Sequence, residues 1–193
     1  MILYLHGFRS SPKSMKARVV GVRMLEMGLE AELRCPQLPA SPKAAMELAL
    51  SLVAGVPAGE LSIIGSSLGG YYATWLAERL GCRAVLLNPA VDPLSSLAGQ
   101  PLVTTQFHSD EPFEFKAAYF DELHALKVER ITQPERYFLL AATGDEVLDH
   151  RTMVTHYAGA RQHVIEGSDH GISEFKTYVD DVLAFCLPSG PTL

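Results

Sequence analysis

The sequence predicts an α/β domain in which helices cover both faces of a mainly parallel sheet. Short β-rich runs alternate with helical patterns along nearly the whole chain, which is typical of βαβ units. In addition, 48% of the 193 residues are hydrophobic, which is enough to build one sizeable core. We therefore expect a single domain over residues 1–193.

Each predicted element is marked by its own residues. The β-rich runs give five strands, at residues 2–5, 61–64, 84–87, 137–142 and 163–165. Apolar residues at the spacing of a helical face predict helices over residues 12–27, 42–52, 66–80 and 175–186. Ser-Pro pairs mark the start of the first two helices, and Gly28 and Gly81 are placed to end the first and the third.

Residues 91–133 break this alternation, because the segment is too long for a plain connection. It follows a central strand and so leaves from the edge where open α/β sheets bind their ligands. We expect it to form a short lid over the site. The alternative is a helical excursion that packs elsewhere on the sheet.

Charge and hydropathy exclude several classes of function. The 22 acidic residues outnumber the 16 basic residues, giving a net charge of −6, which argues against a nucleic-acid or membrane surface. The apolar runs are far shorter than the roughly 18 residues of a membrane span. Met1 leads directly into the first strand without a signal-like start, and the three cysteines are widely separated. We therefore expect a cytoplasmic protein without a metal or a cofactor.

The run Gly65-Ser66-Ser67-Leu68-Gly69 fits the Gly-x-Ser-x-Gly nucleophile elbow. It lies between an apolar strand and an amphipathic helix, where such an elbow holds a serine hydroxyl out of the sheet on a strained turn. Ser67 is therefore the candidate nucleophile, and Ser66 is expected to face away from the site. The alternative is a glycine and serine turn without chemistry.

A serine hydroxyl needs a base, and the base needs an acid to orient it. In this arrangement the acid and then the histidine follow the nucleophile along the chain. Asp145 comes directly after the fourth predicted strand, and His170 comes after the fifth. The rival acids are Asp149, which we expect to cap a helix, and Asp169, which is adjacent to the histidine.

The developing oxyanion needs two backbone donors. The N–H of Leu68 directly follows the nucleophile, and the N–H of Phe8 belongs to the loop after the first strand, where Gly7 allows a close approach. We expect these two groups to form the oxyanion hole. His6 is expected to brace this loop and not to act as a base.

Four blocks of the sequence resemble the YqiA-like esterase family of small α/β-hydrolases. They are residues 3–8 with Ser10-Ser11-Pro12, residues 64–76, residues 88–91 and residues 143–149. The resemblance implies a serine esterase whose triad falls on Ser67, Asp145 and His170. We therefore predict a minimal α/β-hydrolase fold, with six mainly parallel strands in the order 2-1-3-4-5-6 and the site at their carboxyl ends.

The expected substrate is a small carboxylic ester or a thioester such as an acyl-CoA, cleaved through an acyl-enzyme. Arg9 and Lys13 belong to a group of cations that precedes the first acid, and they lie close to the oxyanion loop. They could bind a phosphate or carboxylate of the substrate, or they could belong to a solvated helix face. The alternative functions are a serine peptidase, a C–C hydrolase on the same scaffold, and a hydrolase-fold binding protein without activity. The oligomeric state stays open.

Overall fold

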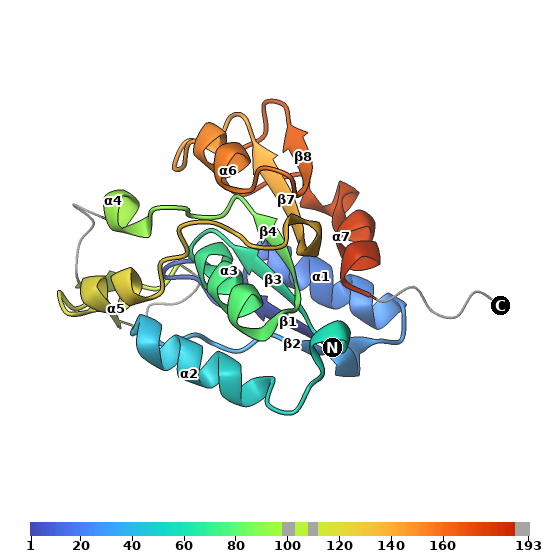
Figure 1. Cartoon of the computed structure of the whole chain (residues 1–193), viewed down its shortest axis with the longest axis horizontal. Coiled ribbons are helices and arrows are strands. Elements are labelled where there is room, and N and C mark those ends of the chain that lie inside the picture. The colour runs from blue at the N-terminus through green and yellow to red at the C-terminus, as the bar shows by residue number, and fades with distance from the viewer. Residues whose placement is uncertain (98–102, 108–111, 188–193) are drawn as a thin grey trace.

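The strands of the main sheet are nearly continuous apolar runs because helices cover both of its faces. A computed structural model of the chain describes residues 1–97, 103–107 and 112–187 (Figure 1). Its six-stranded sheet has the order β2-β1-β3-β4-β7-β8, and every neighbouring pair is parallel. The strands are β1 (Ile2–Leu5), β2 (Leu33–Arg34), β3 (Ser62–Ser66), β4 (Arg83–Leu87), β7 (Tyr137–Ala142) and β8 (Arg161–Ile165).

The predicted strand order is confirmed, since these six strands, counted along the chain, follow the order 2-1-3-4-5-6. The five strands placed from the sequence are all present. The sixth, β2, has only two residues at the edge of the sheet, which is too short to leave a hydrophobic pattern.

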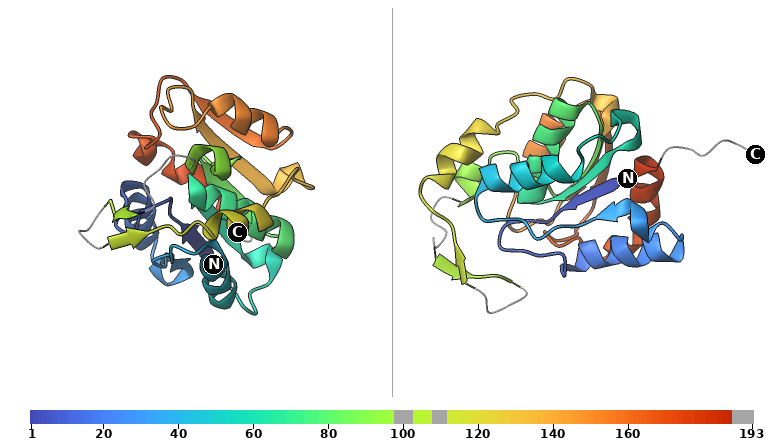
Figure 2. Two further views of the ribbon diagram at one scale, coloured as in Figure 1. Left: turned by 90° about the vertical axis from the view of Figure 1, so that its left-hand side faces the viewer. Right: turned by 90° about the horizontal axis from the view of Figure 1, so that it is seen from below.

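Alternate residues along each strand face opposite sides of the sheet and enter two separate cores. Leu3 and Leu5 of β1 belong to the core beneath α2, α3 and α6, whereas Ile2 and Tyr4 belong to the core beneath α1 and α7. Figure 2 shows the sheet between these two helical layers. The helices are α1 (Met15–Glu26), α2 (Pro42–Leu52), α3 (Leu68–Leu80), α6 (His150–His156) and α7 (Val179–Cys186).

The helix ends follow the predicted signals with one correction. Ser41 Oγ accepts a hydrogen bond from the Ala44 N–H at the start of α2, and Gly81 ends α3 with φ +73°. The first helix, however, begins at Met15 and not after Ser11. Ser11 instead closes a turn, because its carbonyl accepts from the Ser14 N–H at 3.0 Å. Four short 3-10 helices precede β2, β3, β7 and α7, over Glu30–Glu32, Ala58–Glu60, Pro134–Arg136 and Phe175–Thr177.

The insertion 91–133 contains α4 (Pro93–Leu97), an antiparallel hairpin of β5 (Val103–Thr105) and β6 (Pro112–Glu114), and α5 (Tyr119–Ala125). Its residues 98–102 and 108–111 lie outside the described residues. The described part packs against segments at the carboxyl ends of the strands: Phe107 N–H donates to the Arg9 carbonyl, and Tyr71 of α3 donates to the Leu123 carbonyl. The lid stays a prediction.

No helix in the described ranges is both long enough and apolar enough to cross a membrane.

Candidate active site

Ser67 lies between the last residue of β3 and the first residue of α3, on a sharp turn of the backbone. Its φ of 54° and ψ of −120° are a combination that costs a residue with a side chain about 1–3 kcal/mol. Two hydrogen bonds fix the backbone of Ser67. The Ser67 N–H donates to the Leu87 carbonyl at 3.0 Å, and the Ser67 carbonyl accepts from the Ala90 N–H at 3.0 Å. The neighbouring strand β4 therefore keeps the serine in this conformation.

The two glycines of the elbow have a steric cause. A Cβ on Gly65 would lie 2.3 Å from the Gly69 carbonyl oxygen, and a Cβ on Gly69 would lie 2.0 Å from the Leu5 carbonyl oxygen. Backbone atoms cannot yield to such contacts without moving β1 or α3. Glycine at both positions is thus a requirement of the turn that presents Ser67.

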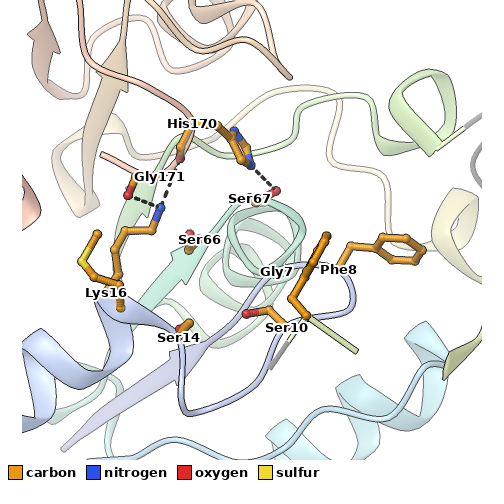
Figure 3. Close-up of a pocket in the computed structure, with 11 residues that line it drawn as sticks. Gly7, Phe8, Ser10, Ser14, Lys16, Ser66, Ser67, His170 and Gly171 are labelled. Carbon is orange, nitrogen blue, oxygen red and sulfur yellow. Dashed lines mark hydrogen bonds between the residues drawn. The ribbon is translucent and has the colours of Figure 1, made fainter. Parts of the chain in front are cut away.

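Ser67, His170 and Asp145 form one hydrogen-bonded line. Ser67 Oγ lies 3.1 Å from His170 Nε2, and His170 Nδ1 lies 2.8 Å from Asp145 Oδ2 (Figure 3 shows the first of these contacts). Because the carboxylate can only accept, Nδ1 carries the proton and Nε2 accepts from the serine hydroxyl. The three residues that the sequence singled out are therefore brought together.

The side chain of Asp145 is fully buried and its oxygens are satisfied. Oδ1 accepts from the N–H groups of Val147 and Leu148, both at 2.8 Å, while Oδ2 accepts from His170. These bonds orient the carboxylate toward the imidazole.

The rival acids lie elsewhere. Asp149 caps α6 by accepting from the Arg151 N–H at 2.9 Å, and its hydrogen bonds with Arg151 lower its pKa to about 2. Asp169 accepts from the Ser173 N–H at 3.0 Å. Within the described residues, Asp145 is thus the acid that is hydrogen-bonded to the imidazole ring of His170.

The loop after β1 approaches Ser67 closely. A Cβ on Gly7 would lie 3.2 Å from the Ser67 Cβ. The N–H groups of Phe8 and Leu68 have no hydrogen-bond partner among residues 1–97, 103–107 and 112–187, so both are free to bind an oxyanion. His6 braces this loop, because its Nε2 accepts from the Leu38 N–H at 3.0 Å and its Nδ1 lies 3.0 Å from the Gly7 carbonyl.

Asn88 is a site residue that the sequence reasoning gave no role. It is fully buried at the end of β4, and its Nδ2 donates to the carbonyls of Asp169 at 3.0 Å and His170 at 3.1 Å. Its Oδ1 accepts from the Ala142 N–H at 2.8 Å. The signal in the sequence that could have identified this residue is an Asn-Pro pair directly after a central strand. Glu146 was missed as well, and its carboxylate accepts from the His170 N–H at 3.0 Å.

A pocket of about 300 Å³ opens beside the serine. Figure 3 shows Lys16, Ser66, Ser67 and His170 around it, and Phe8 and Phe107 contribute apolar surface to its lining. The expectation that Ser66 faces away from the site is wrong. Ser66 ends β3 on the same face as Ile64, which packs in the core beneath α1, and the pocket lies on this face.

Arg9 and Lys13 do not line this pocket. Arg9 Nε donates to the Thr105 carbonyl at 2.8 Å, and its guanidinium lies 4.4 Å from the centre of the Phe107 ring. Lys13 is exposed and lies at a separate groove on the outer side of α1. In the part of the chain that the structure describes, no three His, Cys, Asp or Glu side chains are grouped as metal ligands would be.

Solved structures of α/β hydrolases share this fold. A structure described as LipS and LipT, two metagenome-derived lipolytic enzymes, matches with a TM-score of 0.70 and 16% identity, over 96% of this chain and 92% of that chain. Alpha/beta hydrolase domain-containing protein 10 from mouse matches at 0.67 and 16%, over 95% and 89%. Est1E from Butyrivibrio proteoclasticus, with ferulic acid bound, matches at 0.68 and 14%, over 95% and 87%. At these identities the likeness shows the fold.

A family model also matches this sequence. It is that of the Uncharacterised protein family (UPF0227), and the match covers residues 1–187.

Proposed function

Because this chain belongs to the Uncharacterised protein family (UPF0227), the YqiA-like family that its four motif blocks indicate, and has an α/β-hydrolase fold, we propose that it is a serine esterase. The observation that carries this proposal is the hydrogen-bonded line from Ser67 through His170 to Asp145. A nucleophile, a base within hydrogen-bond reach and a third group that orients the base are what acyl transfer requires.

In the proposed mechanism Ser67 Oγ attacks the carbonyl carbon of the ester while His170 Nε2 takes the hydroxyl proton. The charge that develops on the carbonyl oxygen is bound by the N–H groups of Phe8 and Leu68, each worth about 2.7–4 kcal/mol in the transition state. Asp145 stabilises the imidazolium that forms. The bond between carbon and the alcohol oxygen then breaks, and the imidazolium gives its proton to the departing alkoxide.

The second half of the reaction uses the same groups. A water molecule loses its proton to His170 as it attacks the acyl-enzyme, and the bond from the acyl carbon to Ser67 Oγ breaks. The proton returns from His170 to Ser67, which releases the carboxylic acid and restores the enzyme. The same steps would cleave a thioester, with a thiolate as the leaving group.

The pocket supports a small substrate. Its 300 Å³ correspond to about ten water molecules at roughly 30 Å³ each, which is at the lower end of the range for ligand sites. We therefore expect hydrolysis to be fastest for short and medium acyl chains.

The test is hydrolysis of p-nitrophenyl esters with acyl chains from acetyl to dodecanoyl, by the native protein and by Ser67→Ala. The substitution should lower kcat by a factor of about 10³ or more, because it removes the nucleophile. Ser66→Ala is the matched control, since it removes the adjacent hydroxyl in the same pocket, and it should keep kcat within about tenfold of the native value.

Activity that survives in Ser67→Ala would contradict the proposed nucleophile. A native protein that hydrolyses no ester but reacts with a serine-directed fluorophosphonate would point to the peptidase or C–C hydrolase alternatives. A native protein that is inert to both would favour the binding protein.

A further inference from the structure

Lys16 is a buried cation in the wall of the pocket that holds Ser67. It lies in the first turn of α1, its side chain lines the pocket, and the residue is only 8% exposed. Lysine is almost never buried to this extent unless its charge is paired. The proposed mechanism gives this ammonium no role.

The ammonium is only partly satisfied by the protein. Its Nζ donates to the carbonyl of Gly171 at 2.9 Å and to the carbonyl of His170 at 3.2 Å (Figure 3). An ammonium has three N–H donors, so one remains. No carboxylate within the described ranges is in ion-pair contact with Lys16.

The charge of Lys16 is therefore unpaired within the described residues. A buried cation without a counter-ion is destabilising, because it has lost its hydration without gaining an opposite charge. A ligand that brings an anionic oxygen into the pocket would supply both the opposite charge and an acceptor for the remaining N–H of Lys16.

We propose that Lys16 binds an anionic oxygen group of the substrate, so that this enzyme selects esters that carry a carboxylate or a phosphate. The inference rests on the proposed esterase function and deepens it. Lys16 takes the place of the half-buried Arg9 and the exposed Lys13, which do not line the pocket.

The surroundings of Lys16 make its charge sensitive to pH. Burial lowers the pKa of its ammonium to about 8, although the carboxylates of Asp145 and Asp169 act in the opposite direction. Asp145 lies in the loop after β7, and Asp169 lies in the loop after β8. His170, in the same loop as Asp169, is the third titratable residue near the ammonium. The ammonium is therefore charged at pH 7 and loses its charge as the pH rises through about 8.

The experiment compares matched esters with the native protein and with Lys16→Met, a substitution that keeps the length of the side chain and removes its charge. One pair places the anion in the acyl group, as mono-p-nitrophenyl adipate against p-nitrophenyl hexanoate. The other places it in the alcohol, as p-carboxyphenyl butyrate against p-carbamoylphenyl butyrate. The readout is the ratio of kcat/KM for the anionic ester to kcat/KM for its neutral partner.

In at least one pair, Lys16→Met should lower this ratio by about 10- to 100-fold, which is the effect of losing one hydrogen bond to a charged group. The pair that responds tells whether the anion belongs to the acyl or the alcohol side. The matched control is Lys176→Met, which removes an exposed ammonium near α1 and should leave both ratios unchanged. In the native protein the responding ratio should fall as the pH rises through about 8, which provides a test that needs no variant.

Equal losses for anionic and neutral esters in Lys16→Met, together with a native ratio that does not change around pH 8, would overturn the inference and leave Lys16 a structural role only. A ratio that responds to Lys13→Met and not to Lys16→Met would also overturn it. In both cases the neutral esters would still be hydrolysed by the native protein, so the proposed esterase function would stand. Failure of that function would instead appear as no hydrolysis of any ester.

Discussion

At the scale of single residues, Asn88 connects three segments that are distant in the sequence. Its side chain joins the end of β4 to the last residue of β7 and to the loop that carries His170. Its backbone has φ +43°, which asparagine adopts more readily than most residues. The position of the base therefore depends on a residue that takes no part in the proposed chemistry.

Asn88→Ala should lower the free energy of unfolding by about 2–4 kcal/mol, because it leaves a buried N–H and two partly buried carbonyls with fewer partners. It should also lower kcat, since the histidine loop loses one of its supports. Urea unfolding and ester hydrolysis measure the two effects. Asn88→Asp keeps the acceptor for the Ala142 N–H but turns a carboxylate oxygen toward two carbonyls, so it should be at least as harmful. Native-like unfolding and kcat in both variants would contradict this role.

The proximity of Ser67, Asp145 and His170 could be predicted because each lies in the segment that follows a strand, and parallel strands bring their carboxyl ends to one edge. Asn88 also follows a strand, but nothing in its neighbours indicates which backbone groups it binds. Lys16 could not be distinguished from the other early cations, because burial of one lysine depends on how α1 packs against the histidine loop. The roles of Asn88 and Lys16 arise from hydrogen bonds between residues more than fifty positions apart in the sequence. The periodicity of apolar residues predicts local structure and carries no information about such contacts.

At the scale of elements, the hairpin of β5 and β6 is fastened to the loop that carries a proposed oxyanion donor. Phe8 makes edge contacts with the rings of Phe113 and Phe115, at centroid distances of 5.1 and 5.3 Å. Arg9 adds its bond to the Thr105 carbonyl and its contact with Phe107. The insertion is therefore a wall of the site and a support of the loop after β1.

Arg9→Gln should weaken this attachment, because a neutral amide neither stacks as a cation on Phe107 nor reaches as far as a guanidinium. We expect faster hydrogen exchange of the β5 and β6 amides, while the free energy of unfolding changes by less than about 0.5 kcal/mol. Exchange measured by mass spectrometry on the native protein and on Arg18→Gln, an exposed arginine of α1, supplies the comparison. Unchanged exchange in the hairpin would show that the aromatic contacts suffice.

Some helix ends could be predicted from the sequence and others could not. The cap of α2 and the glycine at the end of α3 are local signals, and both lie where the sequence places them. The start of α1 is displaced by three residues from the Ser-Pro signal, because residues 11–14 form a hydrogen-bonded turn instead of the first turn of the helix.

At the scale of the whole molecule, Glu78 links α3 to the segment that leads into β7. Its carboxylate accepts from Thr132 Oγ1 at 2.6 Å and from the Tyr137 hydroxyl, and it lies 3.6 Å from the Arg136 guanidinium. Partial burial raises the pKa of Glu78, whereas the hydrogen bonds from Thr132 and Tyr137 lower it. The hydrogen bonds together have the larger effect, so the pKa of Glu78 lies below its usual range.

A carboxyl group with a lowered pKa in the folded state stabilises the protein above its unfolded pKa of about 4.3, and the contribution disappears as the pH falls through the folded value. Glu78→Gln should therefore be less stable than the native protein at pH 7, by about 1 kcal/mol after allowance for solvent screening. The difference should shrink toward pH 3. Urea unfolding across this pH range tests the expectation, with Glu135→Gln as an exposed control on the neighbouring turn. A difference that does not depend on pH would contradict it.

The sheet as a whole could be predicted because its central strands are apolar runs separated by capped helices. The two-residue edge strand β2 and the hairpin of the insertion could not, since neither is long enough to show a period. Their places are set by contacts with β1 and with the loop after it.

The hydrogen bond between Ser67 and His170 spans 103 residues, and the bond from Lys16 to Gly171 spans 155. During synthesis from the N-terminus, the ribosome therefore completes the turn that carries Ser67, the proposed nucleophile, long before it makes His170, the proposed base. A nascent chain that stops before β8 would carry the serine without the means to activate it. Labelling by a fluorophosphonate would then begin only when the last strand and its loop have joined the sheet. Reactivity of the Ser67 hydroxyl would therefore report when β8 and its loop join the sheet, while far-UV circular dichroism would report the formation of helices and strands.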